Sequence, residues 1–547
     1  METAPLNPNP QAAGIPQPLF RLVSGPQGYG LIYQELALHR AEDPWAEAAG
    51  WLARSHRHFS NQDPGLALVY GLGLGYHLKL LRRQYPGLRL LVYEPVPEIK
   101  EFWDINPALG PEGNGSLHIF TSPEDFKAAV SREVVYGRGQ GLMVVTAETY
   151  QDLDPEGWAA FNDFVRREII RRAVIDRTRS QTGPAFMENL ALNAGKILKR
   201  PDLMLLKGRL PARAAFLVGS GPSLDQNAAC LREVGARGLI LSAASAVKPL
   251  LAHGVSPDVI VVLESEDTSA YLRLAEEEKA VLKPGTVLAL ASGCHPAHFE
   301  LPGFHQAVFH LSPGEALLFS RGTFLPQGGN AGTAAFALAY CWGLAPLILV
   351  AQDQAYAGGG RLHAQGTPGA VVDQDGTPLI VPGVDGGQVA TNTGLLASLN
   401  WYAEAARTVK SKPFPPELIN ASAGGARIEG FQEADLGAVV AGLPPVSGPL
   451  DLAAVLPKLP LGSKKEVEGD IRQLAGVVST LRRLAGMDYK KAYNEIKDIG
   501  QVSKFLERVL AEAQVATERR EILAALDRAE MVMATMGKAL KSSEALN

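Results

Sequence analysis

The chain of 547 residues is longer than one hydrophobic core usually organises, and its 46% apolar and 20% charged content is ordinary for a globular protein. A net charge of -5, without runs that interleave basic and aromatic residues, argues against a nucleic-acid partner. Its three scattered cysteines have neither disulfide nor metal-ligand spacing, so we expect them in hydrophobic cores and the protein in a reducing cytoplasm.

The amino-terminal part of the sequence predicts a tail, a first domain and a connector. The start lacks the positive and apolar regions of a signal peptide, so we expect a flexible tail over residues 1–29. Residues 30–150 contain LALVYGLGLGYHLKLLRRQYPGLRLLVYEP, which reads as strand, glycine turn, helix and strand and predicts a Rossmann-like domain. A charged helical pattern over residues 151–211 predicts a connector.

The remaining sequence predicts a second α/β domain and a helical end. Residues 212–440 alternate apolar strands with helical or glycine-rich segments, which predicts a second doubly wound sheet. Residues 441–547 carry apolar side chains at helical spacing, without proline after a proline-rich start. The expected fold class is therefore α/β, with two doubly wound Rossmann-like domains joined by a helical connector, and a C-terminal helical bundle.

One uncharged stretch, residues 331–351, is long enough to cross a bilayer. Gly343 and Pro346 interrupt it, and Asn330 can cap a helix that begins there. We therefore interpret it as a helix ending near Gly343 followed by a buried parallel strand, and we expect no membrane span.

The first glycine turn, GLGLGYHL, places Gly71, Gly73 and Gly75 directly after a strand. Glu94 ends the next strand, where dinucleotide and S-adenosylmethionine sites bind a ribose hydroxyl. Tight turns need glycine for steric reasons alone, and no catalytic set of a dehydrogenase or methyltransferase follows. We favour a structural or remnant turn, with a cofactor site as the alternative.

The second glycine turn, GSGPSLD, also leads from a strand into a helix. Its glycines allow close backbone approach to a ligand, and its serines lie beside the N–H groups of a helix N-terminus, which favours an anion. A merely structural turn, with Asp225 in the first helical turn, is the alternative. The residues proposed here for nucleotide binding are Gly219, Ser220, Gly221, Pro222 and Ser223.

Polar residues follow the later strands of this domain, at the edge where doubly wound sheets bind ligands. They include Ser242, Ser245, Glu264, Gln352, Asp353 and Tyr356. A second backbone nest is expected in PQGGNAGTAAF, where Asn330, Gly332 and Thr333 surround a helix start. Two helix N-termini facing one crevice would suit a phosphate diester or a diphosphate.

His363, in a glycine-rich loop after the Asp353 strand, is the candidate general base. Asp353 could orient His363, accept a hydrogen bond from Tyr356, or bind a divalent ion, and the sequence leaves these open. His295 and His298 are spaced loosely like ligands but lack a third partner, so we expect no metal site there.

The ordered motifs GSGPSLD, PDVIVVLES, GGNAGTAAFALAYCWGLAPLILVAQDQAY, RLHAQG, GVDGGQVATN and LINASAGGARIEG resemble those of motility accessory factor (Maf) proteins, which are flagellin glycosyltransferases. The GLGLGYHL domain and the helical carboxyl end also resemble that family, so the similarity covers most of the chain. The family's central domain is similar to the bacterial family-42 sialyltransferases. The resemblance therefore implies a CMP-activated sugar donor.

Residue by residue, the resemblance implies several roles. Gly221, Pro222 and Ser223 would flank the cytidine nucleotide, while Gly332 and Thr333 would lie near the donor phosphate and sugar. Tyr356 matches a tyrosine that stabilises the departing phosphate, and His363 is a looser match to the base; with Asp353, these are the expected catalytic residues. Glu264 stands where sialyltransferases favour asparagine, and it would bind a ribose hydroxyl.

The implied reaction is inverting transfer of a nonulosonic acid, such as pseudaminic or legionaminic acid, to Ser or Thr of flagellin, without a required metal. The oligomeric state stays open. The runner-up is similarity to archaeal 6-hydroxymethylpterin diphosphokinase, which would use ATP and magnesium with Asp353 and Glu264 as carboxylates. A non-catalytic flagellin-binding chaperone, with His363 a mere loop residue, is the third alternative.

Overall fold

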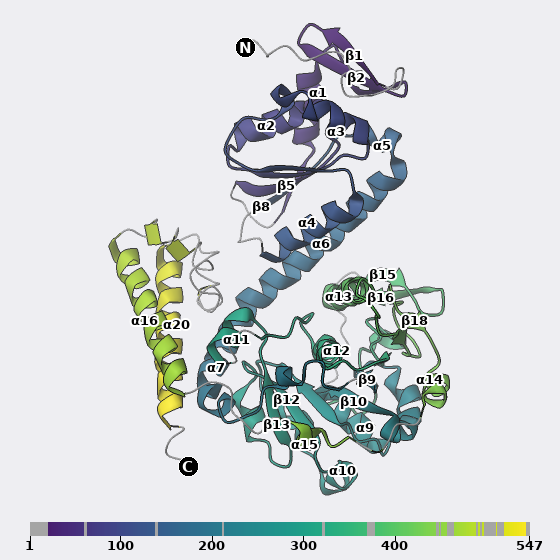
Figure 1. The fold of residues 1–547 in the computed structure, drawn as a ribbon, viewed down its shortest axis with the longest axis vertical. Helices are drawn as coiled ribbons and strands as arrows, with labels where there is room; N and C mark the ends of the chain where they lie inside the picture. The colour runs from purple at the N-terminus through teal and green to yellow at the C-terminus, as the bar shows by residue number, and fades with distance from the viewer. Residues whose placement is uncertain are drawn as a thin grey trace. The chain divides into compact units, whose positions relative to one another are not determined.

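The computed structural model describes residues 20–58, 63–136, 141–210, 213–319, 323–368, 378–444, 448, 450–456, 464–487, 491–492, 495–496, 510 and 519–542. The chain divides into two compact units, Met1–Ile175 (unit 1) and Asp176–Asn547 (unit 2). Both units are α/β (Figure 1), as the sequence predicts.

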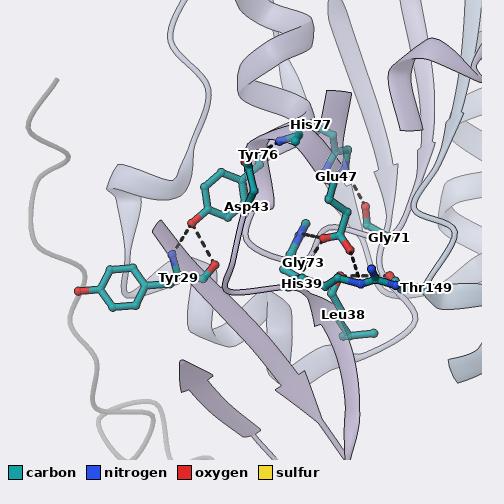
Figure 2. A network of polar contacts seen from close by, with 12 residues as sticks. Tyr29, Leu38, His39, Asp43, Glu47, Gly71, Gly73, Tyr76, His77 and Thr149 are labelled. Carbon is teal, nitrogen blue, oxygen red and sulfur yellow. Dashed lines mark hydrogen bonds and ion pairs between the residues drawn. The ribbon is translucent and has the colours of Figure 1, made fainter. Parts of the chain in front are cut away.

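Unit 1 begins with a small antiparallel sheet of β1 (Phe20–Gly25), β2 (Gly28–Tyr33) and β3 (Leu36–His39). The expectation of a flexible tail over residues 1–29 is therefore wrong for residues 20–29, because β1 pairs with β2 along its whole length. Tyr76 also holds this sheet: its hydroxyl accepts from the Tyr29 N–H at 2.8 Å and donates to the Tyr29 carbonyl at 3.1 Å (Figure 2). Residues 1–19 lie outside the described residues.

The main sheet of unit 1 has the order β4-β8-β5-β6-β7, with β4 antiparallel to β8 and the other pairs parallel. Its strands are β4 (His56–His58), β5 (Pro64–Tyr70), β6 (Arg89–Tyr93), β7 (Leu117–Phe120) and β8 (Gly141–Thr146). Its helices are α1 (Pro44–Ala53), α2 (Tyr76–Gln84), α3 (Pro97–Asp104), α4 (Pro123–Tyr136) and α5 (Tyr150–Leu153). Strand order reverses between β5 and β8, so this is the switch point of a Rossmann-like fold.

The connector of residues 151–211 resolves into two different helices. α6 (Pro155–Gln181) runs for 27 residues from unit 1 into unit 2, and its Phe161 and Phe164 are buried in the core of unit 1. α7 (Gly183–Ile197) belongs to unit 2, because Leu190 and Ala194 are fully buried in that unit's largest core. α6 therefore contains the boundary between the two units, whereas α7 lies within unit 2.

Unit 2 contains an eight-stranded, entirely parallel sheet of order β13-β12-β11-β10-β9-β14-β17-β18. Its strands are β9 (Ala214–Val218), β10 (Gly238–Ala243), β11 (Val259–Val262), β12 (Val287–Ala291), β13 (His305–Phe309), β14 (Leu347–Val350), β17 (Leu418–Asn420) and β18 (Gln432–Glu433). The order reverses between β9 and β14, which places the switch point there. A hairpin of β15 (Leu379–Pro382) and β16 (Gln388–Thr391) stands apart from the sheet.

The strands of this sheet are buried on both sides, so other parts of the unit must pack on both of its faces. Alternate residues of β9 enter different cores: Leu217 joins the cluster that contains α7 and α12 (Ala331–Trp342), and Phe216 joins the cluster on the opposite face. Further helices around the sheet are α8 (Leu224–Asn227), α9 (Val247–Ala252), α10 (Glu276–Val281), α11 (Pro313–Phe319), α13 (Thr393–Lys410), α14 (Leu436–Gly442) and α15 (Leu452–Val455).

The uncharged stretch at 331–351 has the predicted structure. Asn330 caps α12 by accepting the Thr333 N–H at 2.9 Å, and Gly343 ends the helix with a φ of 87°, before strand β14. Among the described residues, no helix combines the length and the apolar composition of a membrane span.

The C-terminal part contains α16 (Lys464–Met487) and α20 (Arg519–Ser542), which pack on each other, and α20 also packs on α7. These helices confirm the expected helical end of the fold. Val478 and Leu526 are fully buried in the same cluster as the central sheet, so α16 and α20 share a core with it.

Candidate functional site

The second glycine turn lies at the switch point of unit 2, where β9 and β14 end side by side. The Gly219 N–H donates to the Val350 carbonyl at 2.9 Å, and the Gly221 N–H donates to the Ala351 carbonyl at 3.0 Å. A Cβ at Gly221 would lie 2.6 Å from the Ala351 oxygen. Glycine is thus required here by the meeting of two loops, whatever ligand the turn holds.

The anion that this turn binds in the structure is Asp353. Its carboxylate accepts the Ser223 N–H at 2.8 Å and also accepts the Ser223 hydroxyl. Asp353 is 6% exposed, and burial raises its pKa to about 6, opposed by these two hydrogen bonds. A carboxylate of the chain itself therefore occupies the Ser223 amide, and nucleotide binding by this turn stays a prediction.

The loop that carries Asp353 has an unusual backbone. Ala351 and Gln354 adopt φ values of 52° and 51°, a left-handed region that costs non-glycine residues free energy. The Ala426 N–H donates to the Asp353 carbonyl at 2.7 Å, which ties this loop to the one after β17. Such strain is typical of a functional loop whose shape is imposed by its surroundings.

His363 lies against the second glycine turn, as its proposed role requires. Its Nδ1 is 3.0 Å from the Ser220 hydroxyl, which accepts a hydrogen bond from the Ser245 hydroxyl at 2.9 Å. Burial lowers the pKa of His363, partly opposed by hydrogen bonding to Ser220, so the imidazole is neutral near pH 7. Among the described contacts Asp353 pairs with Ser223, and it makes none with His363.

Tyr356 follows Asp353 on the same loop and is half-buried. Its backbone N–H donates to the Ala390 carbonyl at 2.8 Å, and its phenol oxygen accepts from Asn392 Nδ2 at 3.0 Å. Asn392 also caps α13, because its Oδ1 accepts the Leu395 N–H at 2.9 Å. Sequence reasoning missed Asn392, although an asparagine directly after a strand and before an apolar run is an ordinary N-cap signal.

The nest expected at the start of α12 is a closed capping arrangement. Thr333 is fully buried, and its hydroxyl accepts the Gly328 N–H at 3.0 Å and donates to the Asn330 carbonyl at 2.9 Å. Asn330 Nδ2 donates to Ser398 Oγ at 2.7 Å, which joins the starts of α12 and α13. Gly332 is buried too, and a Cβ there would meet the side chain of Gln352.

Two further predicted residues lie at the ends of β10 and β11. Ser242 is fully buried and offers no surface to a ligand, although its hydroxyl has no hydrogen-bond partner among the described residues. The residue Glu264 as a whole is partly exposed, but its carboxyl group is buried, and this burial raises its pKa. Hydrogen bonds from backbone N–H groups, including that of Leu263 at 3.0 Å, oppose this rise.

The side chains of His295 and His298 are hydrogen-bonded within the chain. His298 uses one ring nitrogen on Thr268 Oγ1 and the other on the His295 carbonyl, both at 3.0 Å. Within the described ranges, no group of three or more His, Cys, Asp or Glu side chains could hold a metal ion.

The first glycine turn, in unit 1, is filled by side chains. Glu94 is fully buried, and its carboxylate accepts the Leu72 N–H at 2.7 Å, the Val96 N–H at 2.9 Å and the Tyr150 hydroxyl at 2.7 Å. The Gly73 N–H donates to the same hydroxyl at 2.9 Å. The acidic residue and the turn amides that a dinucleotide would need are thus bound to each other.

The glycines of this turn accommodate aromatic side chains. A Cβ at Gly71 would lie 2.7 Å from the Tyr150 ring, and one at Gly75 would meet Trp103. His77 Nε2 lies 3.0 Å from the Gly71 carbonyl (Figure 2), and burial lowers the pKa of His77 to about 3. These contacts support the structural interpretation of the first turn.

The fold and site define a class: a doubly wound α/β protein whose polar, partly exposed residues gather at the switch point of its second sheet. A family model described as 6-hydroxymethylpterin diphosphokinase MptE-like matches residues 188–359, which include the second glycine turn, Asp353 and Tyr356 but end before His363. No curated protein matches the chain.

Among solved structures, the chain is similar to the MAf glycosyltransferase from Magnetospirillum magneticum AMB-1, with a TM-score of 0.56 and 17% identity over 97% of this chain and 92% of that chain. Both matches agree with the resemblance drawn from the sequence motifs. A likeness at this identity establishes the shared fold, and the activity has to be argued from the site.

Proposed function

We propose that the chain is a glycosyltransferase that moves a nonulosonic acid, of the pseudaminic or legionaminic type, from a CMP-activated donor to a Ser or Thr hydroxyl of flagellin. The observation that carries the proposal is the placement of His363, neutral and held at the second glycine turn, on the same loop as Tyr356 at the switch point. The similarity to a MAf glycosyltransferase supports the class of reaction.

In this reaction His363 takes the proton of the acceptor hydroxyl while the hydroxyl oxygen bonds to the anomeric carbon of the sugar. The bond from that carbon to the donor phosphate breaks with inversion, and CMP leaves. Tyr356 donates a hydrogen bond to the departing phosphate, whose charge grows as the bond breaks. Asp353 would hold the turn through Ser223 rather than exchange a proton. The scheme requires no metal ion.

The acceptor is a protein, so the enzyme needs more surface than a sugar pocket offers. Unit 1 and the C-terminal helices have no other evident task, and we assign flagellin recognition to them. The transfer would take place in the cytoplasm and would serve assembly of the flagellum and motility.

A second candidate is pyrophosphoryl transfer from ATP, as in 6-hydroxymethylpterin diphosphokinase. The family match favours it, because the matched segment contains Asp353 and Glu264 and leaves out His363. Against it, the Asp353 carboxylate is already bonded to Ser223 and nearly buried, which leaves little of it for a magnesium ion.

The nucleotide separates the two candidates. A ligand that binds only the folded state raises the melting temperature, and at 100 times its Kd it adds about 2.7 kcal/mol. We expect CMP to shift the melting of the full chain and ATP with magnesium to leave it unchanged. Incubation with a CMP-nonulosonic acid and purified flagellin should then add the sugar mass to flagellin. A higher melting temperature with ATP but not with CMP would favour the diphosphokinase. Binding of CMP without sugar transfer would indicate a non-catalytic binding protein.

A further inference from the structure

The five residues Arg361–Gln365, which we call the His363 segment, are attached to the second glycine turn on both sides of the imidazole. Asp225, in the first turn of α8, accepts from Arg361 Nη1 at 2.9 Å through Oδ2. Its Oδ1 accepts the Gln365 N–H at 2.8 Å. One carboxylate therefore holds the segment two residues before and two residues after His363.

Two further contacts join the segment to the second glycine turn, both at Ser220. The Ala364 N–H donates to the Ser220 carbonyl at 2.8 Å, and His363 Nδ1 meets the Ser220 hydroxyl. Ala364 is 2% exposed and packs in the same core cluster as Val218 and Leu224. The backbone beside His363 is thus fixed to the turn by hydrogen bonds and by burial.

A glycine lies directly before and directly after the His363 segment. Gly360 and Gly366 have φ values of 76° and 77°, which favour glycine. Glycine on each side lets the chain leave its position easily, so the attachments, rather than the loop's own stiffness, determine where the imidazole lies.

We propose that Asp225 is a positioning residue for His363: it pairs with Arg361 and the Gln365 amide and so holds the imidazole beside the second glycine turn. Asp225 touches no reacting atom in this scheme and acts only through the segment. The inference rests on the proposed function for its kinetic readout, and its structural readout is independent of any activity.

The structural readout is hydrogen exchange of the full-length protein. Because the Ala364 and Gln365 amides are both hydrogen-bonded, a peptide covering them should exchange slowly in the wild type. Asp225→Ala should speed that exchange at least about tenfold, and Asp225→Asn less, because its amide oxygen can still accept from Gln365. Glu404→Ala, which removes an exposed ion pair with Arg407 on α13, is the matched control and should leave this peptide unchanged. Equal exchange in wild type and Asp225→Ala would overturn the proposal.

The kinetic readout uses sugar transfer to flagellin. Displacing a catalytic group by about 1 Å can cost a factor of about 100, so Asp225→Ala should lower kcat by about 10- to 100-fold with the donor KM nearly unchanged. Arg361→Lys should retain more activity than Arg361→Ala. In a His363→Ala background, Asp225→Ala should add little further loss, since both changes disable the same group.

The outcomes separate the two proposals. Full additivity of the two substitutions, or a raised KM with kcat intact, would refute positioning through His363 even if exchange rises. Absence of transfer by the wild type would refute the proposed function, and the exchange experiment would still decide whether Asp225 holds the segment. A circular dichroism spectrum and melting temperature like those of Glu404→Ala confirm that Asp225→Ala is folded.

Discussion

The two glycine turns of this chain occupy the same position in two sheets and are used differently. Each follows the strand at a switch point, β5 in unit 1 and β9 in unit 2, and each binds a carboxylate through its amides. In unit 1 the residue reaching over from the neighbouring strand end is Tyr150, whose ring and hydroxyl fill the turn. In unit 2 it is Asp353, a shorter side chain.

The difference lies in what remains accessible. Glu94, His77 and Tyr150 are all fully buried, so the first turn is completed by its own unit. Around the second turn, Ser220, Tyr356 and His363 stay partly exposed. A glycine-rich turn after a strand therefore does not by itself indicate a ligand; the side chains that arrive from the neighbouring strand ends decide whether one can enter.

The largest effect that separates the accessible second turn from the buried first turn is expected when the proposed base, His363, is removed. General bases contribute roughly 10²- to 10⁴-fold, so His363→Ala should lower turnover by about that factor. CMP binding should stay within about twofold, because the base contacts the acceptor and not the nucleotide. Single-turnover transfer and CMP titration measure the two quantities. Wild-type rates in the variant across neutral pH would give the role to another group.

The two buried carboxylates predict a difference in how pH affects stability. Burial raises the pKa of Glu94 to about 7, opposed by its hydrogen bonds, against an unfolded value near 4.5. The folded state therefore holds the proton longer than the unfolded state, and stability falls as pH rises from about 4.5 to 7. The shift corresponds to about 3 kcal/mol. For Asp353, with a pKa of about 6, the same loss should be smaller and end near pH 6.

Local hydrogen exchange can follow each carboxylate separately. After correction for intrinsic rates, peptides containing Leu72 and Val96 should lose protection up to about pH 7, and the peptide containing Ser223 only up to about pH 6. Glu94→Gln should abolish the slope in the first set alone. Slopes of the opposite sign would mean that the hydrogen bonds to these carboxylates outweigh their burial.

Tyr356→Phe tests the second proposed catalytic residue near the second glycine turn. It removes the hydroxyl that would donate to the departing phosphate, and we expect transfer to slow about tenfold while donor binding weakens less. Donor Kd and single-turnover rate, measured on the same variant, check this. Asn392→Asp is the companion variant, because Asn392 Nδ2 donates to the Tyr356 oxygen and the substitution removes that donor. An equal loss in Kd and rate would indicate uniform binding instead.

The lowered pKa of His363 predicts the acid limb of the pH profile. A base must be neutral, so activity falls as pH drops through its pKa, and burial places that midpoint below the usual 6.5. Asp353, with a pKa of about 6, titrates in the same range. The limb should persist in Asp353→Asn and disappear from the residual activity of His363→Ala; loss of the limb in Asp353→Asn would identify the carboxylate as the titrating group.

The sequence predicts the folds well because periodic patterns determine them. Strand, turn and helix around Gly71 and Gly219 follow from apolar runs and glycine, and the cap at Asn330 and the end at Gly343 follow from local backbone chemistry. The small sheet that begins at Phe20 is not found by such reasoning, because Tyr29 in this sheet is hydrogen-bonded to Tyr76, 47 positions away.

The candidate site is only partly visible in the sequence, for a related reason. That Asp353 and Ser223 meet depends on which strands are neighbours, and that Ser242 is buried depends on the face of β10 from which it projects. The pairing of Asp225 with Arg361 spans 136 positions. Residue type and strand ends identify where a site lies, whereas the partner of each polar group requires the fold.

The smallest expected effect completes the comparison of the two turns. If the first turn only supports unit 1, Glu94→Gln should leave sugar transfer within about twofold of wild type at a temperature where the variant is folded. Neither S-adenosylmethionine nor NAD should raise the melting temperature, because the amides of Leu72 and Gly73 are already bonded to Glu94 and Tyr150. Calorimetric titration and the transfer assay measure both. Micromolar binding of either cofactor would show that Tyr150 can leave the turn, and the two turns would then differ in their ligands rather than in whether they bind one.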